Sequence, residues 1–415
     1  MKYTITAPGK IQAKIELPSS KSISNRALVM SVLAGGNILP ANLSDCDDTE
    51  VMIAALKNMP DVIDIKAAGT AMRFMTAFLC VGTGEHVVTG TERMKHRPIG
   101  VLVDALRYLG ADISYVGEEG YPPLLIRGRQ LEGGHIDIPG NISSQYISAL
   151  LMIGPVLEKG LELRLKGNIV SRPYIDLTLW MMKEYGADAE WTDVDTITVN
   201  PVPYREREYL IENDWSASSY WYEILALAND SESEVMLTGL KDGSRQGDSV
   251  ARYISSMLGV KTTFVSKQSD SMPMVRLSRY IRTLPRLDYD FVNSPDLAQT
   301  YVVACCALGI PFHFTGLASL KIKETDRIEA LKKELRKLGF LVDDIGGCEM
   351  IWDGKRCEPT GEPIDTYEDH RMAMAFAPLA LTLGKIEINN PEVVSKSYPG
   401  FWNDLRKAGF GVCGS

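Results

Sequence analysis

The sequence predicts an α/β protein of two or three domains, built from one small unit that is used six times. Its 415 residues exceed one typical domain of roughly 150 residues. Five segments also repeat the order of an amphipathic helix, a glycine and a short strand-like run. The glycines follow one another at intervals of 76, 73, 80 and 70 residues: Gly110, Gly186, Gly259, Gly339 and Gly409.

Each glycine stands where the residue after a helix takes the left-handed backbone conformation. A sixth, weaker copy spans residues 54–65, where Asn58, Met59 and Pro60 end the helix instead. The implied unit of roughly 70 residues is longer than common solenoid repeats, so we expect mixed rather than purely parallel strands. The alternative is coincidence, because joints of helix, glycine and strand are frequent in α/β proteins.

The composition excludes several classes of protein. Hydrophobic residues make up 45% and charged residues 23%, which is ordinary for a folded globular chain. The net charge of −9 argues against nucleic acid as a partner. The seven cysteines form no CxxC pair, which favours free thiols in a reducing compartment. The five histidines form no HExxH or HxH cluster, so we expect no metal site.

The N-terminus and the apolar runs indicate a cytoplasmic protein that does not enter a membrane. The first twenty residues alternate between polar and apolar and lack the apolar segment of a signal peptide. The longest apolar stretch near the end, residues 373–383, is too short to span a bilayer.

The first candidate for chemistry is the segment LPSSKSISNRALVM, residues 17–30. A strand is expected to end at Leu17 and Pro18, and a helix to begin near Asn25. Lys21 and Arg26 stand among four serine hydroxyls and free backbone N–H groups, a combination that binds anions at helix starts. The missing GxxxxGK[ST] pattern excludes a P-loop. A polar helix cap with solvated cations is the alternative.

Two further segments place arginines near expected helix starts. In AAGTAMRFM, Gly69 lets the backbone approach a ligand and Arg73 follows one turn later, although an ordinary helix start explains both. In TERMKHRPIG, alternate spacing on an extended segment would put three cations on one side. They would bind an anion or form a solvated basic edge: Arg93, Lys95 and Arg97.

A fourth segment, GNISSQYISALLM, leads three consecutive polar residues into an apolar helical run. Polar side chains beside free N–H groups suit a phosphate, whereas a plain helix cap is the alternative. These residues are Ser143, Ser144 and Gln145. The later SRPYID, which read alone is a turn, adds Ser171 and Tyr174.

The strongest single segment is LASLKIKETDRIEALKKELRKLG. From Thr325 onward it predicts a long helix with charge pairs four residues apart. Those pairs do not account for Lys323, Glu324 and Arg327, which crowd around the helix entry. Glu324 beside two cations would stay ionised unless it is buried, and it could move protons.

Three further segments complete the candidate set. In YEDHRMAMAFAPLAL, His370 and Arg371 precede an almost wholly apolar helix. A cation there opposes the helix dipole and calls for a nearby anion. Asp296 heads a buried helix, where capping is itself expected. Lys396 lies in a loop before a proline and could be a plain surface lysine. An acidic chain with so many cations at helix starts predicts a small polyanionic substrate.

Taken in this order, the segments resemble the 5-enolpyruvylshikimate-3-phosphate synthase family of enolpyruvyl transferases. The resemblance runs from about Ala7 to Leu405. It rests on LPSSKSISNRAL, GTAMR, RMKHRPIG, SSQYISALL, KETDR, EDHRMAMA and the late lysine. It implies transfer of the enolpyruvyl group of phosphoenolpyruvate to the 5-hydroxyl of shikimate 3-phosphate, through a tetrahedral intermediate and with release of phosphate.

The resemblance also implies an α/β (α+β) fold of two domains, each with three βαβαββ-like repeats. Residues 1–18 and 214–415 would form the C-terminal-type domain, which is discontinuous, and residues 19–213 the N-terminal-type domain. The hinge would lie near residues 18–20 and 212–215, and the two lobes would close on the substrates.

The site residues that the resemblance implies fall into three groups. Shikimate 3-phosphate would be bound by Lys21, Ser22, Arg26, Ser143, Ser144, Gln145, Ser171, Tyr174, Asp296 and Lys323. Phosphoenolpyruvate would be bound by Lys21, Gly69, Arg97, Gln145, Arg327, Arg371 and Lys396. The acid–base candidates are Asp296 and Glu324, assisted by Lys21. No cofactor is implied, and we expect a monomer whose partners are small molecules only.

The sequence departs from the family pattern at Ala67, Phe74 and Ser319, where asparagine, proline or leucine, and asparagine are usual. These departures leave binding constants and the response to the family inhibitor glyphosate open. The nearest rival is the sister transferase that acts on UDP-N-acetylglucosamine. That family carries a reactive cysteine in the loop corresponding to RMKHRPIG, and no cysteine lies between Cys80 and Cys305 here. A non-catalytic relative that binds phosphorylated metabolites is the other alternative.

Overall fold

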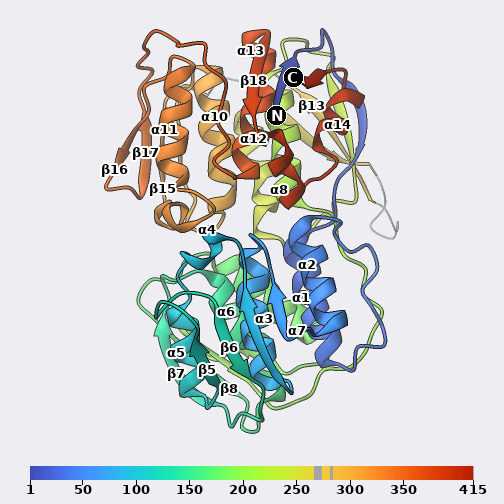
Figure 1. The fold of residues 1–415 in the computed structure, drawn as a ribbon. Helices are drawn as coiled ribbons and strands as arrows, with labels where there is room; N and C mark the ends of the chain where they lie inside the picture. The colour runs from blue at the N-terminus through green and yellow to red at the C-terminus, as the bar shows by residue number, and fades with distance from the viewer. Residues whose placement is uncertain (266–272, 281–283, 415) are drawn as a thin grey trace. The chain divides into compact units, whose positions relative to one another are not determined.

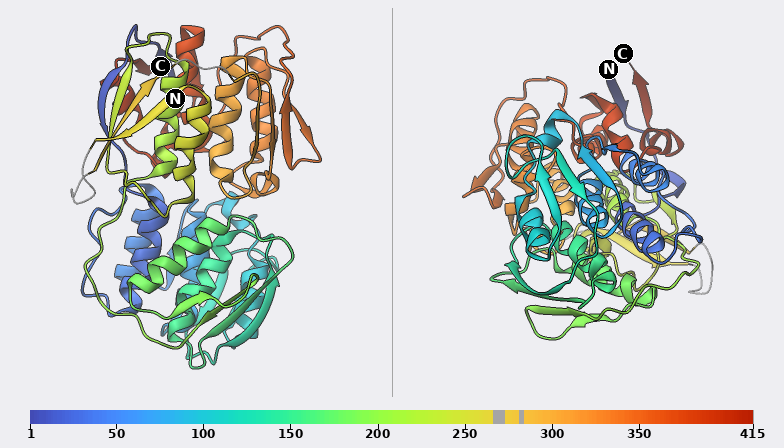
Figure 2. Two further views of the ribbon diagram at one scale, coloured as in Figure 1. Left: turned by 180° about the vertical axis from the view of Figure 1, so that it is seen from behind. Right: turned by 60° about the horizontal axis from the view of Figure 1, so that its bottom comes forward.

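The structure is a computed structural model that describes residues 1–265, 273–280 and 284–414 (Figure 1). The chain divides into two compact units. Residues Met1–Ser19 and Glu212–Ser415 form one, which we call the discontinuous unit, and residues Ser20–Ile211 form the other, the continuous unit. Within the discontinuous unit the two chain ends lie side by side, because strand β1 pairs with β19 (Figure 2).

The continuous unit contains two four-stranded sheets with the same topology. The first has the order β3-β4-β6-β5, and the second has the order β7-β8-β10-β9. In each sheet the first two strands along the chain run parallel and the other pairs run antiparallel. The strands are β3 (Val62–Asp64), β4 (Glu85–Thr89), β5 (Asp112–Tyr115), β6 (Leu124–Arg127), β7 (Gly134–Pro139), β8 (Leu161–Lys166), β9 (Ala189–Trp191) and β10 (Thr196–Val199).

The discontinuous unit repeats this topology twice, in the orders β12-β13-β11-β2 and β14-β15-β17-β16. Again the first two strands of each sheet are parallel and the rest antiparallel. The strands are β2 (Gln12–Glu16), β11 (Glu234–Thr238), β12 (Val260–Phe264), β13 (Met274–Arg279), β14 (Leu287–Asp290), β15 (Phe312–Thr315), β16 (Asp343–Ile345) and β17 (Glu349–Trp352). Four copies of a βαβαββ unit are therefore complete, and the α/β fold class is confirmed.

The other two expected copies are reduced. The fifth has a three-stranded sheet, β18-β1-β19, to which a single parallel bridge between Ile364 and Ile388 adds a fourth segment. Its strands are β1 (Lys2–Thr6), β18 (Lys385–Asn389) and β19 (Gly411–Gly414). The sixth keeps one parallel bridge, between Ala41 and Leu210. Asn42, directly after Ala41, has a positive φ of 60°, so the extended backbone that a longer ladder needs ends there.

The helices connect the strands of each repeat (Figure 1). The continuous unit has α1 (Lys21–Leu33), α2 (Asp47–Asn58), α3 (Gly69–Val81), α4 (Glu92–Lys95), α5 (Gly100–Tyr108), α6 (Ser144–Ile153) and α7 (Arg172–Glu184). The discontinuous unit has α8 (Trp215–Leu227), α9 (Ala251–Met257), α10 (Ala298–Leu308), α11 (Arg327–Lys337), α12 (His370–Phe376), α13 (Ala380–Leu383) and α14 (Phe401–Lys407). Short 3-10 turns also occur, among them η2 (Gly247–Val250), η3 (Pro295–Leu297) and η6 (Pro391–Lys396).

The five glycines that marked the repeat all take positive φ angles, between 84° and 100°, directly after α5, α7, α9, α11 and α14. The same hydrogen bond closes several of these helix ends. After α5, for example, the N–H of Ala111 donates to the carbonyl of Leu106 at 3.0 Å. Met59 takes the corresponding left-handed position after α2, with φ 41°. The predicted helix ends are therefore confirmed.

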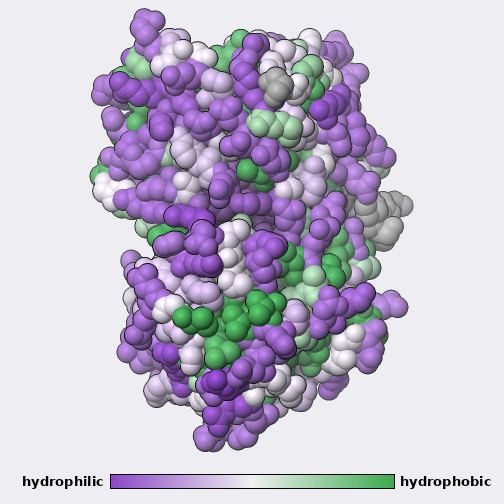
Figure 3. Space-filling model, in the orientation of Figure 1, coloured by the Kyte–Doolittle hydropathy of each residue, from purple (hydrophilic) through white to green (hydrophobic). Residues whose placement is uncertain are grey.

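Each unit has its own hydrophobic core. Aromatic and aliphatic side chains of α8, α10 and α12 fill the core of the discontinuous unit, whereas α3, α6 and α7 supply much of the core of the continuous unit. Hydrophilic residues dominate the molecular face in Figure 3. None of the helices in the described part of the chain is both long and apolar enough to cross a bilayer.

Three local predictions were wrong. Helix α1 begins at Lys21 rather than near Asn25, because the Ser20 hydroxyl accepts from the N–H of Ile23 and caps the helix early. Residues 92–95 form helix α4, capped by Thr91, instead of an extended segment, so the three cations do not share one side. In α11 the charge pairs that form are three residues apart, Glu329 with Lys332 and Glu334 with Lys337.

Candidate active site

The predicted site residues gather at one topological position in the repeats. The carboxyl ends of parallel strands meet at the same sheet edge, and ligands of α/β sheets bind there. Gly69, Ser143 and Asp296 follow the first strand of their repeats, β3, β7 and β14. Residues after the second strand of each parallel pair include Arg97, Ser171, Lys323, Glu324 and Arg327. Arg371 follows the bridge at Ile364, and Lys396 follows β18. Within each unit, the repeat topology thus places residues that are far apart in the sequence at equivalent strand ends.

In the continuous unit, the starts of α6 and α7 carry the serine cluster. Ser143 caps α6 by accepting from the N–H of Gln145 at 3.3 Å, and Ser144 is the first helical residue. The preceding loops lie side by side, because the N–H of Val170 donates to the carbonyl of Gly140 at 3.1 Å. Ser171 is buried and takes the left-handed conformation at φ 54°, a strain that is common at functional sites. Hydroxyls and N–H groups of two helices therefore meet in a form that suits a phosphate.

Arg97 is buried to 7% exposure beside the start of α3. A Cβ atom at position 69 would lie 2.6 Å from Arg97 Nη1, so a side chain there would require this guanidinium to shift. Arg73 fixes the neighbouring loop, because its Nη2 donates to the carbonyl of Pro98 at 3.0 Å. No ion pair in residues 1–265, 273–280 and 284–414 involves Arg97, and its Nε is buried without a partner. A buried charge of this kind calls for an anionic ligand.

Arg26 is buried deeper and serves first as a structural tie. Its Nε donates to the Thr178 hydroxyl at 2.7 Å and its Nη2 to the Ser148 hydroxyl at 2.9 Å, which joins α1 to α7 and α6. The guanidinium also lies over the ring of Phe74, 5.3 Å from its centre. Burial lowers the pKa of Arg26 to about 10. The family departure at Phe74 is therefore packed against a predicted site residue.

The remaining predicted residues of this unit lie close by. The Lys21 ammonium pairs with Asp48 of α2 at 3.1 Å. The Gln145 amide donates to the Thr70 hydroxyl at 3.1 Å, which links the starts of α6 and α3. Tyr174 lies in the first turn of α7 and is half-buried, whereas Ser22 lies in the first turn of α1 and accepts from Arg26 through its carbonyl at 2.9 Å.

In the discontinuous unit, Arg327 binds three carboxylates. It is 1% exposed, and its nitrogens lie 2.6 Å from Asp369, 2.9 Å from Glu324 and 3.0 Å from Asp296. Burial alone would lower the pKa of Arg327, but the charge of Asp369, followed by those of Glu324 and Asp296, raises it above its ordinary value. The guanidinium is thus a permanent charge that fixes all three carboxylates.

Asp296 in turn is shared by three cations. Arg327 lies 3.0 Å away, Arg371 lies 3.1 Å away and Lys323 lies 3.5 Å away. Burial would raise the pKa of Asp296, but the charge of Arg371, followed by those of Lys323 and Arg327, holds it well below its ordinary range. Arg371 therefore has the nearby anion that its position at the start of α12 called for. With this set of cations, Asp296 stays ionised at neutral pH.

Lys396 supports the turn before α12. Its ammonium donates to the carbonyl of Glu368 at 2.7 Å. Tyr367 and Glu368 both have positive φ angles, 52° and 55°, and they precede the cap residue Asp369. This lysine is therefore tied to the strained segment that presents Arg371.

Two carboxylates of the site were missed by the sequence analysis: Asp369 and Asp48. Asp369 is fully buried, caps α12 and makes the shortest contact to Arg327. Its place directly before His370 and Arg371 was the available signal, since aspartate is a preferred helix cap. Asp48 gave no such signal, because its pairing with Lys21 depends on how α2 packs against α1.

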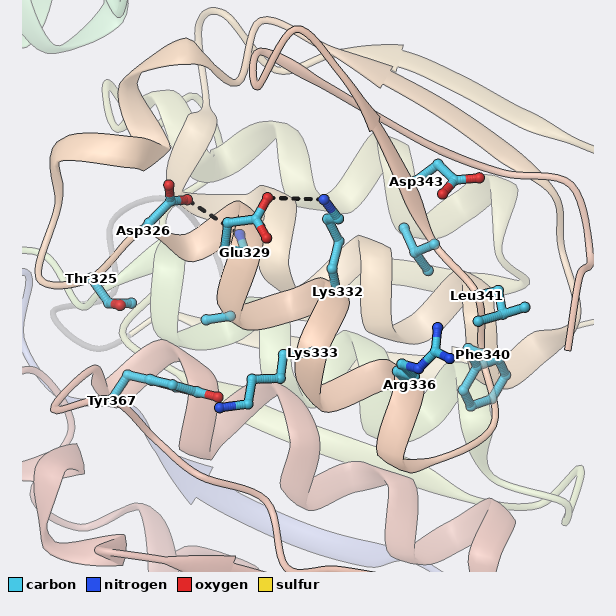
Figure 4. A pocket seen from close by; sticks show the side chains of 12 residues that line it. Thr325, Asp326, Glu329, Lys332, Lys333, Arg336, Phe340, Leu341, Asp343 and Tyr367 are labelled. Atoms are coloured by element: carbon cyan, nitrogen blue, oxygen red, sulfur yellow. Dashed lines mark hydrogen bonds and ion pairs between the residues drawn. The ribbon is translucent and has the colours of Figure 1, made fainter. Parts of the chain in front are cut away.

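The pocket in Figure 4 lies along α11 and is not the predicted site. Thr325, Asp326, Lys333, Arg336 and Tyr367 are among its lining residues, and none of the predicted site residues is. Two of its lysines already have partners: Lys332 pairs with Glu329 at 2.9 Å, a contact drawn in Figure 4, and Lys333 lies over the Tyr367 ring. Among the described residues, no cluster of three or more metal-ligating side chains could hold a metal ion.

The repeated α/β fold and its two sets of cations and carboxylates define a class, enzymes that act on small phosphorylated substrates. The family model described as EPSP synthase (3-phosphoshikimate 1-carboxyvinyltransferase) matches residues 5–63 and 57–405. The chain therefore belongs to the EPSP synthase family.

Curated relatives agree with this assignment over nearly the whole chain. A 3-phosphoshikimate 1-carboxyvinyltransferase of Bacteroides fragilis is 57% identical over 413 residues, which cover 99% of both chains. One of Photobacterium profundum is 36% identical and covers 97% of both chains. An EPSP synthase structure from Acinetobacter baumannii covers 100% of both chains with a TM-score of 0.76 at 21% identity, which supports the fold alone.

Proposed function

We propose that this protein transfers the enolpyruvyl group of phosphoenolpyruvate to the 5-hydroxyl of shikimate 3-phosphate and releases inorganic phosphate. The reaction would supply the shikimate pathway to chorismate and the aromatic amino acids. The observation that carries the proposal is the 57% identity with a 3-phosphoshikimate 1-carboxyvinyltransferase over 99% of the chain. The chemistry of the site supports it, because both proposed substrates are small phosphorylated anions.

We assign the 3-phosphate of shikimate 3-phosphate to the serine cluster of α6 and α7. Ser143, Ser144 and Ser171 supply hydroxyls and N–H groups where two helices begin. We assign the carboxylate and hydroxyls of the shikimate ring to five further residues of the continuous unit and two residues of the discontinuous unit. These are Lys21, Ser22, Arg26, Gln145, Tyr174, Asp296 and Lys323.

Phosphoenolpyruvate requires several cations, because its phosphate and carboxylate are both ionised. Arg97 is the group best prepared for it, since the guanidinium is buried beside Gly69 and has no ion-pair partner within the described parts of the chain. We assign the rest of the binding to Lys21, Gln145, Arg327, Arg371 and Lys396. Arginine suits this task because its planar fork can bind phosphate or carboxylate with two parallel hydrogen bonds.

The proposed reaction is an addition followed by an elimination. A proton is added to the methylene carbon of phosphoenolpyruvate, which makes C2 electrophilic. The 5-hydroxyl oxygen then bonds to C2 and loses its proton, which gives a tetrahedral intermediate. Loss of a proton from the new methyl group and cleavage of the bond to phosphate restore the enol ether. Each well-placed proton transfer contributes roughly 10²–10⁴-fold to the rate.

Asp296 and Glu324 are the proposed acid–base groups, with Lys21 in support. Glu324 lies at the entry to α11, 2.9 Å from Arg327. Asp296 is a weak base while Arg327, Arg371 and Lys323 all face it. When substrate anions bind to those cations, the cations stabilise the ionised form of Asp296 less, and Asp296 becomes a stronger base. Substrate binding would thus prepare the base at the moment it is needed.

Phosphate release distinguishes the possible acceptors. The purified chain is mixed with phosphoenolpyruvate and either shikimate 3-phosphate or UDP-N-acetylglucosamine, with a control that lacks any acceptor. We expect release only with shikimate 3-phosphate. Release only with the UDP-sugar would contradict the proposed acceptor, and a folded protein that releases phosphate with neither would favour a non-catalytic binding role. We also propose a monomer in the cytoplasm, in keeping with seven cysteines that form no disulfide.

A further inference from the structure

In each of the four complete repeats, a loop follows the second strand of the parallel pair. Only the loop after β11 carries no residue that has been assigned a role so far. The corresponding loops elsewhere carry Arg97, Ser171 and Arg327. Here the loop has the sequence KDGSRQG, residues 241–247. In the structure it leads into η2, where Asp248 is 2% exposed. A buried carboxyl group at a position that in the other repeats carries residues assigned to the substrates needs a reason.

This loop is bound tightly to the start of α8. The N–H of Trp215 donates to the Gln246 side chain at 3.2 Å, and the Gln246 amide donates to the carbonyl of Asn213 at 2.8 Å. The Ser216 hydroxyl donates a very short hydrogen bond to Asp248. The position of the Asp248 carboxyl group is therefore fixed by the first turn of α8.

The same face of α8 also holds the predicted site. Tyr220 lies four residues after Ser216, so the two side chains stand one above the other on the helix. The Tyr220 hydroxyl accepts from Arg371 Nη1 at 3.5 Å, and Arg371 Nη2 lies 3.1 Å from Asp296. One helix face thus positions Asp248 through Ser216 and the pair of Arg371 and Asp296 through Tyr220.

Charged groups from three elements act on Asp248. Asp214 at the start of α8 and Asp296 on η3 oppose its ionisation, whereas Arg371 on α12 favours it. Burial raises the pKa of Tyr289 on β14, and the charge of Asp248 contributes to that increase. Burial, followed by the charge of Asp296, raises the pKa of Asp248 to about 6. This carboxyl group would therefore change its charge near neutral pH, beside cations assigned to phosphoenolpyruvate.

We propose that Asp248 is a positioning residue of this active site, whose ionisation state sets how strongly Arg371 and its neighbours attract the anionic substrate. The inference rests on the proposed function. Protonated Asp248 leaves the positive charge of Arg371 to Asp296 and the substrate, whereas ionised Asp248 competes for it. Binding of phosphoenolpyruvate adds negative charge nearby and so favours the protonated form.

The test is the pH profile of kcat/KM for phosphoenolpyruvate between pH 5 and 8.5, measured with saturating shikimate 3-phosphate. This ratio reports ionisations of the free enzyme, whereas kcat reports those of the complex. Asp248→Asn imitates the neutral form at every pH. We expect its kcat/KM, relative to wild type, to rise with pH through about 6 and to level off at about tenfold, which corresponds to one pKa unit of coupling. Comparison at equal pH cancels the ionisation of the substrate itself.

Ser216→Ala provides a second, independent variant. It removes a hydrogen bond that favours the ionised form of Asp248. The transition in kcat/KM is therefore expected at higher pH in this variant than in wild type. Thermal unfolding checks that both variants are folded. If Asp248→Asn does not fold, the Ser216→Ala profile decides alone, and an unmoved transition overturns the proposal.

The outcomes separate this inference from the proposed function. Wild-type protein without turnover would contradict the function and, with it, the role of Asp248. Wild-type turnover together with a constant ratio between Asp248→Asn and wild type at every pH would overturn only the role of Asp248. A transition that appears in kcat instead of kcat/KM would also overturn it, because the group would then act in the complex.

Discussion

The two units differ in the groups that bind their buried arginines. In the continuous unit, Arg97 is buried with no carboxylate bound to it among the described residues, and Arg26 is bound by hydroxyls and carbonyls. In the discontinuous unit, Arg327 and Arg371 are bound by aspartates and a glutamate of the same unit. The difference teaches that Arg97 can offer its whole charge to a ligand, whereas Arg327 and Arg371 share their charge between the proposed substrate and the carboxylates that they hold in place.

The largest effect that tests this comparison is expected at Glu324. If the carboxylates of the discontinuous unit move protons, Glu324→Gln should lower kcat by about 10²–10⁴-fold, the range for one lost general acid or base. Binding of shikimate 3-phosphate should change far less. Steady-state kinetics and calorimetric titration on one preparation give both values. Glu329→Gln, on the exposed side of the same helix, is the matched control and should keep wild-type kcat. Equal losses in turnover and binding would refute the acid–base role.

The second prediction concerns the buried cation of the continuous unit. Arg97→Gln should raise the KM for phosphoenolpyruvate by about 30-fold, which corresponds to about 2 kcal/mol for a lost charge-assisted hydrogen bond. Arg93→Gln removes a cation from the exposed helix α4 and should change KM little. A KM that is unaffected by Arg97→Gln would mean that this arginine is structural, and the contrast between the units would fall.

A third prediction uses a buried carboxyl group that faces no cation among the residues that the structure describes. Glu223 of α8 is 2% exposed, and neither side-chain oxygen has a hydrogen-bond partner in the described structure. Burial raises its pKa well above the ordinary value. The unfolded chain releases this proton at lower pH than the folded chain does, so the group destabilises the fold increasingly as pH rises above the unfolded pKa.

Glu223→Gln removes this titration. Its free energy of unfolding, relative to wild type, should therefore increase with pH from about 4.5 upward, by at most about 1.4 kcal/mol per pH unit. Urea unfolding at a series of pH values measures the slope. A difference that is constant with pH would show that Glu223 ionises as freely as it does in the unfolded chain.

The smallest effect is expected at Lys396. Its ammonium is half-buried and is bound to the carbonyl of Glu368, so it contributes less than a buried arginine. Lys396→Ala should raise the half-saturating concentration of phosphoenolpyruvate by about fivefold, or about 1 kcal/mol, and spare shikimate 3-phosphate. Lys385→Ala is a control on an exposed strand position. Unchanged phosphoenolpyruvate kinetics would remove Lys396 from the site.

Most of the fold could be predicted because its rules are local. A glycine one residue beyond the C-cap of a helix favours positive φ, and Gly110 and Gly339 show this at two distant joints. The amount of strand pairing could not be predicted in the same way. The reduced repeats at Ala41 and Ile364 depend on which chain segment reaches the ladder. The assignment of the two units as family-type domains with a hinge near 18–20 and 212–215 stays a prediction.

The residues of the site also differ in how far they could be predicted from the sequence. Cations at helix starts, such as Arg97 and Arg371, are visible as sequence motifs, and the structure brings them to the expected ends of the repeats. Their roles toward substrates stay predictions. The partners Asp369, Asp48 and Asp248 could not be assigned from the sequence, because each contact joins different elements of the fold. Whether an arginine is neutralised within its own unit is a property of packing rather than of motif.

The central claim is that the carboxylates of the discontinuous unit move the proton of phosphoenolpyruvate while Arg97 only binds it. The most direct test follows deuterium entering the methylene group in D₂O, by proton NMR and with both substrates saturating. We expect incorporation at near wild-type rate in Arg97→Gln and at least about 100-fold slower in Glu324→Gln. Equal rates in the two variants would contradict the division of labour between the units.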